Sequence, residues 1–136
     1  MTRRSPGFRL ALGVLSIFAL SAVLSCSSST APVTGLPPHD VAIVQGAATM
    51  ASNAFSPNPF TVKLSSGGKV TWANGDFTGD AYGGTGVTHH IVSDSPLFDS
   101  GLLAPFATFQ FTFTAAGSYP YHCMIHPSMV GTIVVN

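Results

Sequence analysis

Apolar and polar residues alternate along short runs of the chain from residue 41 onward. Phe109, Phe111 and Phe113 are separated by single polar residues, and Val70 and Trp72 repeat this spacing. Successive side chains of a β-strand point to opposite faces, so the pattern is typical of strands with one buried and one solvated face. The same reasoning predicts strands at 41–45, 60–64, 69–74, 89–93, 108–114, 118–122 and 130–135.

No useful stretch of the chain from residue 41 onward has the periodicity of an amphipathic helix. Short strands separated by turn residues therefore predict an all-β fold, a β-sandwich of seven or eight strands. A domain of this length can bury a sufficient core without disulfides. The segment 75–87 contains several glycines, and we expect it to form a mobile or tightly turning loop.

The first 25 residues differ from this domain in composition. Arginines at positions 3, 4 and 9 precede a mostly apolar run over 10–24, which is the pattern of a secretory signal. The apolar run is too short for a comfortable membrane span. We therefore predict a signal peptide over residues 1–25 and export of the protein.

Cys26 follows directly after this predicted signal. The small residue Ser25 before it and the polar run 27–30 after it resemble a bacterial lipobox, in which the cysteine is lipidated and becomes the mature N-terminus. This resemblance implies attachment to a bacterial membrane through a lipid on Cys26, on the periplasmic or cell-surface side. An ordinary signal peptide cleaved nearby is the alternative, and it also implies export.

Residues 26–40 are rich in Ser, Thr and Pro and end in Leu36-Pro37-Pro38 before the domain begins. This composition favours an extended tether that holds a domain away from a surface. The chain is thus predicted to consist of a signal over 1–25, a tether over 26–40 and one folded domain over 41–136.

The formal net charge of the whole chain is zero, but the predicted signal contains all three arginines. Without it, Lys63 and Lys69 face five aspartates, so the mature chain is mildly acidic. A nucleic-acid-binding surface requires clustered Lys and Arg residues. Such a cluster does not occur here, and nucleic acid is not an expected partner.

The polar residues that indicate a function lie in the run 121–129. Cys123, His126 and Met129 follow one another at steps of three, so a thiolate, an imidazole and a thioether can converge from one short loop. A second imidazole is available upstream from His89 or His90, on a β-branched segment. Two imidazoles, one thiolate and a weak axial thioether suit copper that cycles between two oxidation states. Electron transfer is therefore the leading interpretation.

The chain has two cysteines, which in an exported protein would ordinarily suggest a disulfide. Cys26 lies at the processing site outside the predicted domain, whereas Cys123 lies among the candidate ligands, so we expect Cys123 to be unpaired. A Cys26–Cys123 bridge is the alternative. Catalysis by a nucleophilic Cys123 is not indicated, because no separate base and orienting acid accompany it. We predict an electron carrier and not an enzyme.

Three further motifs accompany this run: Phe55-Ser56-Pro57, the strand 70–74 and the turn 98–101. Together with the compact Cys-x-x-His-x-x-Met loop of 121–129, they resemble the cupredoxins, and among these the small plastocyanins and amicyanins, the loop being similar to that of amicyanin. The resemblance implies an eight-stranded Greek-key sandwich with one type 1 copper ion at one end. The ligands that it implies are His89, Cys123, His126 and Met129.

The resemblance also decides between the two adjacent histidines, since neighbours on a strand point to opposite sides and only one can face the metal. In the cupredoxin pattern the ligand is followed by a polar residue and a β-branched pair, which selects His89. The backbone N–H of His90 is then expected to donate to the Cys123 sulfur, and its side chain to help tie two loops together.

Ile125 occupies a position where close relatives usually have proline, two residues after the ligand cysteine. Proline has no N–H to donate. If the N–H of Ile125 points to the Cys123 sulfur, a second hydrogen bond would withdraw charge from the thiolate and favour reduced copper. On this hypothesis, Ile125→Pro lowers the reduction potential.

His126 should lie closest to the surface among the four predicted ligands, because it belongs to a loop and not to a strand. Its apolar neighbours are candidates for a patch on which redox partner proteins dock. Ordinary loop packing is the alternative explanation of these residues. The candidates are Met124, Ile125 and Pro127, with Leu102 and Leu103 as further ones.

These observations predict a monomer that binds one copper ion and shuttles single electrons between redox partner proteins. A copper carrier or store would use similar ligands in a more exchangeable site. A multicopper enzyme needs further copper sites, and no His-x-His pairs occur here. Structural zinc sites usually contain more thiolates and seldom a methionine, and a metal-free adhesion sandwich leaves the ligand spacing unexplained.

Overall fold

The computed structural model describes Met1, residues 35–80 and residues 83–136. The predicted signal, Cys26 and most of the predicted tether lie outside the described residues. Within the part of the chain that the structure describes, no helix has the length and apolar character needed to cross a membrane.

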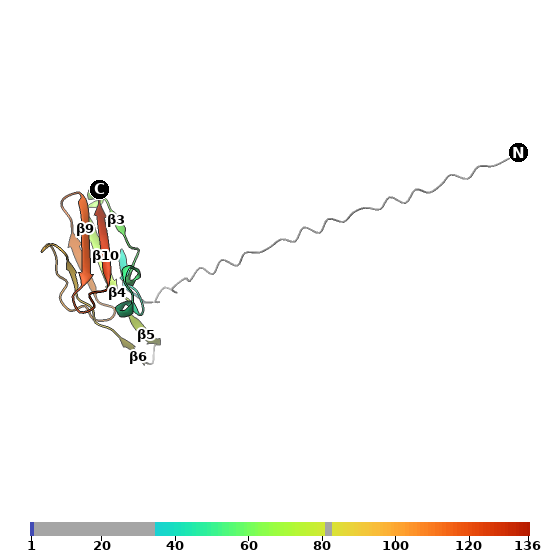
Figure 1. Ribbon diagram of the computed structural model, residues 1–136, viewed down its shortest axis with the longest axis horizontal. Helices are drawn as coiled ribbons and strands as arrows, with labels where there is room; N and C mark the ends of the chain where they lie inside the picture. The colour runs from blue at the N-terminus through green and yellow to red at the C-terminus, as the bar shows by residue number, and fades with distance from the viewer. Residues whose placement is uncertain (2–34, 81–82) are drawn as a thin grey trace.

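Two four-stranded sheets face each other in a β-sandwich (Figure 1), which confirms the predicted all-β fold. The first sheet has the order β2-β1-β4-β8 and the second the order β3-β10-β9-β7. The strands of the first sheet are β1 (Val41–Ile43), β2 (Phe55–Ser56), β4 (Lys69–Asn74) and β8 (Thr108–Thr112). Those of the second are β3 (Phe60–Val62), β7 (Ile91–Ser93), β9 (Gly117–Cys123) and β10 (Val130–Val135).

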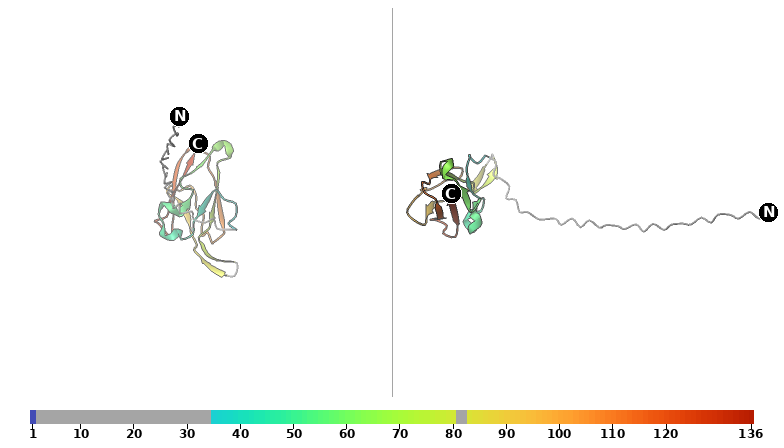
Figure 2. Two further views of the ribbon diagram at one scale, coloured as in Figure 1. Left: turned by 90° about the vertical axis from the view of Figure 1, so that its right-hand side faces the viewer. Right: turned by 90° about the horizontal axis from the view of Figure 1, so that it is seen from above.

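The glycine-rich segment 75–87 is not the loop that we expected. It forms an antiparallel pair of strands, β5 (Phe77–Asp80) and β6 (Gly83–Gly86), in which Gly79 lies opposite Gly84. A Cβ on Gly79 would lie 2.4 Å from the Cα of Gly84, and a Cβ on Gly84 would lie 2.7 Å from the Cα of Gly79. The glycines therefore permit a close approach of two strands, and two views show the pair projecting from the end of the sandwich away from the C-terminus (Figures 1 and 2).

Three single turns of 3₁₀ helix complete the described elements. They are η1 (Ala47–Thr49), η2 (Ser52–Ala54) and η3 (Leu64–Ser66). The first two lie in the connection between β1 and β2, and η1 begins after Gly46, whose φ of 75° is in the left-handed region.

Aromatic side chains fill the space between the two sheets. Trp72 of β4 and Tyr121 of β9 are buried and meet at 5.7 Å between ring centroids in an edge-to-face arrangement, a favoured geometry for aromatic pairs. Phe98 packs on Trp72 from the segment that follows β7, with 5.4 Å between centroids. The core is thus formed by residues from both sheets, as a sandwich requires.

The alternation predicted for β8 is confirmed, because Phe109 and Phe111 are half-buried while Gln110 between them is exposed. The alternation predicted for β4 is wrong, since Thr71 and Ala73 are buried as well. The strand lies between β1 and β8, and the side chain of Gln110 reaches across to donate to the Thr71 hydroxyl at 3.1 Å. The outer face of β4 is therefore covered.

The pairing of β9 with its two neighbours places the predicted ligands at one end of the second sheet. Residues Val130 to Val135 of β10 run back antiparallel to β9, so the loop between them lies at the end opposite the C-terminus. On the other side of β9, Cys123 is paired with Ile91 of β7. Residues just before β7 therefore lie beside Cys123.

Candidate metal centre

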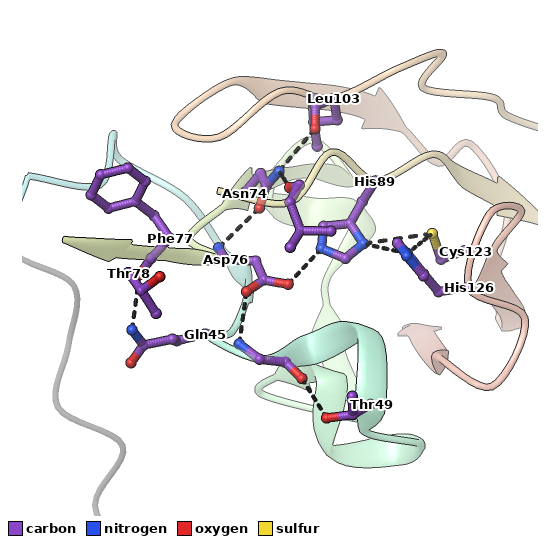
Figure 3. Close-up of polar contacts among 12 residues, drawn as sticks. Gln45, Thr49, Asn74, Asp76, Phe77, Thr78, His89, Leu103, Cys123 and His126 are labelled. Atoms are coloured by element: carbon purple, nitrogen blue, oxygen red, sulfur yellow. Dashed lines mark hydrogen bonds and ion pairs between the residues drawn. The ribbon is translucent and has the colours of Figure 1, made fainter. Parts of the chain in front are cut away.

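Three donor atoms converge at this end of the sandwich: Cys123 Sγ, His89 Nδ1 and His126 Nδ1. The sulfur lies 3.7 Å from His89 Nδ1 and 3.8 Å from His126 Nδ1, and the two nitrogens are 3.2 Å apart. Among the described residues, this is the one group of three or more His, Cys, Asp or Glu side chains close enough to share a metal ion. Figure 3 shows the His89 ring pointing toward the other two donors.

The loop between β9 and β10 contributes two of these donors. Cys123 is the last residue of β9, and its N–H donates to the carbonyl of Met129 at 3.1 Å. The N–H of Met129 in turn donates to the carbonyl of His126 at 2.9 Å. These two bonds close the loop into a compact turn that carries the imidazole of His126 back over the thiol.

Burial differs among the four predicted ligands in the way that we expected. His89, Cys123 and Met129 are each 0% exposed, whereas His126 is partly exposed. The coordination of metal by the Met129 thioether stays a prediction, supported by its burial at the end of the same loop.

His89 reaches the site from the segment that precedes β7. Its backbone exchanges two hydrogen bonds with that of Leu103, with its N–H donating at 3.1 Å and its carbonyl accepting at 2.7 Å. The structure therefore brings His89, and not His90, to the other two donors. Burial lowers the pKa of His89 below its ordinary value, against a raising effect of the hydrogen bond and charge of Asp76 and a smaller lowering effect of His126.

The backbone N–H of His90 makes the contact that we predicted, and its side chain has a partner that the sequence analysis did not name. Its backbone N–H donates to the Cys123 sulfur at 3.4 Å, and its ring nitrogen Nε2 contacts Asp99 Oδ1. The N–H of Gly101 donates to the same carboxylate oxygen at 2.8 Å. The hydrogen bond from Gly101 makes the larger contribution and that from His90 the next, and together they lower the pKa of Asp99 below its ordinary value. His90 thus ties the segment before β7 to the turn at 98–101.

The second hydrogen bond expected at the sulfur, from the N–H of Ile125, does not occur among the hydrogen bonds of the described residues. The backbone N–H that reaches Cys123 Sγ is that of His90. Ile125 lies in the exposed part of the loop and is 48% exposed. This geometry gives the Ile125 hypothesis no support.

Asp76 is a site residue that the sequence analysis missed. Its Oδ2 lies 2.9 Å from His89 Nε2, the ring nitrogen that faces away from Cys123 and His126. The side chain of Asp76 is 5% exposed. Sequence spacing offers no signal for this contact, because the two residues are 13 positions apart and are separated by the β5–β6 pair.

Docking of a partner protein at this end stays a prediction, but the exposure of the candidate residues can be compared with it. Met124, Ile125 and Leu102 are 53%, 48% and 75% exposed, so they present apolar surface near the loop of His126. Leu103 does not belong to this patch, because it is 3% exposed and part of the hydrophobic core. Its backbone pairing with His89 turns its side chain inward.

The two sulfur–nitrogen separations fit a small first-row metal ion. Zinc, which is close to copper in size, bonds thiolate sulfur at about 2.3 Å and imidazole nitrogen at about 2.0–2.1 Å, so a trigonal arrangement separates sulfur and nitrogen by roughly 3.8 Å. The observed separations of 3.7 and 3.8 Å agree. One thiolate with two imidazoles, and a buried methionine beside them, is the donor set of blue copper sites.

A β-sandwich with a largely buried Cys-His-His cluster at one end is typical of one class, the single-copper redox proteins of all-β fold. Residues 41–136 match the family described as copper binding proteins, plastocyanin/azurin family. The chain belongs to this family, the cupredoxins, and the resemblance noted in the sequence is confirmed.

Individual relatives agree with this assignment. The chain is 33% identical to a plastocyanin of Cucumis sativus over 100 residues, which span 62% of this chain and 90% of the plastocyanin. It is similar to the solved structure of a purple cupredoxin from Nitrosopumilus maritimus, with a TM-score of 0.60 at 27% identity over 73% of this chain and 100% of that one. It also resembles a Cu-containing nitrite reductase from Thermus scotoductus, with a TM-score of 0.55 at 28% identity over 73% of this chain and 22% of the reductase chain.

Copper is therefore the metal of this site, which confirms the predicted cofactor. The family and the cluster support, in general terms, a copper-binding electron carrier. The likeness to nitrite reductase extends over about a fifth of that enzyme and concerns the shared sandwich.

Proposed function

We propose that this protein is an exported carrier that binds one type 1 copper ion and shuttles single electrons between redox partner proteins. The observation that supports this proposal most directly is the triangle of Cys123 Sγ, His89 Nδ1 and His126 Nδ1 in a chain of the cupredoxin family. Met129 completes the proposed ligand set as a weak axial donor. Bound copper supplies the one-electron couple, and the protein supplies the ligands and their surroundings.

The described residues suit such a role because burial and backbone hydrogen bonds hold the ligands in place. Cys123 and His89 are fully buried, and their backbones are fixed by hydrogen bonds to Met129, Leu103 and β7. A framework that keeps its ligands in one position for both oxidation states needs little reorganisation when an electron moves. The N–H of His90 donates to the sulfur and thereby lowers the charge density of the thiolate.

His126 is the proposed point at which electrons enter and leave. It is the partly exposed ligand, and the exposed apolar residues Met124, Ile125 and Leu102 belong to the same end of the sandwich. An apolar surface around it allows a partner protein to approach closely and to dissociate quickly.

The proposal extends to the location of the protein. Residues 1–25 act as a lipoprotein signal, a lipid on Cys26 anchors the chain to a bacterial membrane, and residues 26–40 tether the copper domain of residues 41–136 on the exported side. Replacing Cys26 with Ala should release the protein from the membrane fraction and abolish incorporation of a labelled fatty acid. A variant that stays membrane-bound and labelled would contradict the anchor.

An absorption spectrum tests the central proposal. The oxidised, copper-loaded domain should show an intense visible band from thiolate-to-copper charge transfer, and Cys123→Ser should remove that band. A matched control is Ser128→Ala, which changes an exposed residue of the same loop. Protein that stays colourless on titration with cupric ion would refute the proposal.

A copper carrier without an electron-transfer role is distinguished by kinetics. An electron carrier should exchange electrons with a small redox reagent much faster than it loses copper to a chelator. Copper that leaves the protein within seconds, together with slow electron exchange, would favour the carrier.

A further inference from the structure

The carboxylate of Asp76 sits behind His89, on the side of the ring away from the other donors (Figure 3). Its Oδ2 lies 2.9 Å from His89 Nε2, and its Oδ1 accepts a hydrogen bond of 2.7 Å from the N–H of Gly46. Each carboxylate oxygen of Asp76 therefore has a hydrogen-bond partner. A carboxylate accepts and does not donate, so His89 must carry its proton on Nε2.

The negative charge of Asp76 lies in a buried position with little positive charge near it. Its side chain is 5% exposed, and within the described part of the chain the basic group in contact with it is the imidazole of His89, which carries no charge as the Nε2–H tautomer. A buried carboxylate without a cationic partner is costly. A metal ion on Nδ1 of the same imidazole would supply positive charge through the ring.

The surroundings of Asp76 hold it in this place. Its N–H donates to Asn74 Oδ1 at 2.9 Å, and its carbonyl accepts from the N–H of Val87 at 3.0 Å. The side-chain amide of Asn74 donates to the carbonyls of Val87 and Leu103, at 2.8 Å each. Because Leu103 is also the backbone partner of His89, this network positions both the main chain and the ring of His89.

We infer that Asp76 is a positioning residue of the metal centre: it fixes His89 as the Nε2–H tautomer with Nδ1 facing the metal, and its buried charge stabilises cupric over cuprous copper. A carboxylate that accepts from a ligand imidazole orients the ring and raises its donor strength. The more highly charged oxidation state gains more from a nearby negative charge. Asp76 therefore lowers the reduction potential. This inference rests on the proposed copper site and names a determinant of its potential.

The chain contains a matched control for this effect. Asp94 also pairs with a histidine, with its Oδ1 2.6 Å from His122 Nδ1, but its side chain is 49% exposed. An exposed charge is screened by solvent and ions. Asp76→Asn and Asp94→Asn remove the same charge, one from a buried site behind a ligand and one from the surface.

The experiment compares both variants with the unmodified copper-loaded protein by visible absorption, redox titration and competition for cupric and cuprous ion. Asp76→Asn should weaken cupric binding about tenfold or more relative to cuprous binding, and each tenfold change raises a one-electron potential by about 59 mV. Asp94→Asn should change neither quantity appreciably. A folded, copper-loaded Asp76→Asn protein with an unchanged potential would overturn the inference.

A second measurement needs no variant and no copper. In the metal-free, ¹⁵N-labelled protein at pH 8, the ring of His89 should show a proton on Nε2 that exchanges slowly with solvent, and a bare Nδ1. The Nδ1–H tautomer, or a rapidly exchanging Nε2 proton, would overturn the inference even if Asp76→Asn does not fold. Failure of the unmodified protein to bind copper would instead refute the proposed function, so the two failures are distinguishable.

Discussion

The two sides of the metal centre are constructed in different ways. The β9–β10 loop supplies Cys123, His126 and Met129 from seven consecutive residues, 123–129, and closes on itself with two backbone hydrogen bonds. The opposite side supplies one donor, His89, which is held by residues from β4, from the residue just before β5 and from the segment at 103. A short loop can thus present ligands by local geometry, whereas the position of His89 depends on contacts between distant segments.

Solvent access separates the histidines of the two sides most clearly, and cavity variants of these two residues should show it. His126→Gly removes a partly exposed ring, so added imidazole should enter from solvent and restore the visible band of the copper-loaded protein. His89→Gly removes a ring that is 0% exposed, and imidazole should restore little or nothing. Equal rescue of both variants, measured by titration with imidazole, would contradict the distinction.

The distant network should also contribute more to stability than the loop does. Asn74 is 0% exposed, and its side chain makes three hydrogen bonds, to the carbonyls of Val87 and Leu103 and from the N–H of Asp76. Asn74→Ala leaves these groups buried without partners, so we expect the free energy of unfolding to fall by about 2–5 kcal/mol.

Urea denaturation of the metal-free protein measures this effect. Ser128→Ala, at an exposed position of the loop, should change the free energy of unfolding by about 0.5 kcal/mol or less. A similar loss of unfolding free energy in both variants would show that the network contributes no more to stability than the exposed loop does.

Met129→Leu tests the axial donor proposed on the loop side. Leucine has a similar volume, so the core should tolerate it at a cost of less than about 1.5 kcal/mol. Loss of a weak thioether donor should keep the blue colour but raise the reduction potential, because cupric copper loses more stabilisation than cuprous copper. A potential and a spectrum identical to those of the unmodified protein would show that Met129 is not a ligand.

Ile125→Pro should have the smallest effect on the potential. The N–H of Ile125 makes no hydrogen bond to Cys123 Sγ among the described residues, while that of His90 does. Proline therefore removes no such bond, and we expect a smaller change than Asp76→Asn produces. A clear lowering of the potential on redox titration would show that the hydrogen bond inferred from the sequence forms when copper is bound.

The sequence by itself was sufficient for the class of fold and for the candidate donors of the loop. Alternation in β8 predicted a half-buried strand, and the spacing of Cys123, His126 and Met129 predicted a soft-metal site, because both signals lie between residues that are close in the chain. His89 was selected over His90 by similarity to the cupredoxins, and the structure places it at the site.

Only the tertiary structure decided the contacts between distant segments. The glycines of 75–87 indicated a loop by composition, but their close pairing in β5 and β6 depends on which residues lie opposite one another. The burial of Leu103 and the contact of Asp76 with His89 likewise depend on how the segments pack. A local pattern reveals which face of a strand is apolar, but the partner of a buried polar group is determined by chain topology, which brings together residues that have no fixed spacing in the sequence.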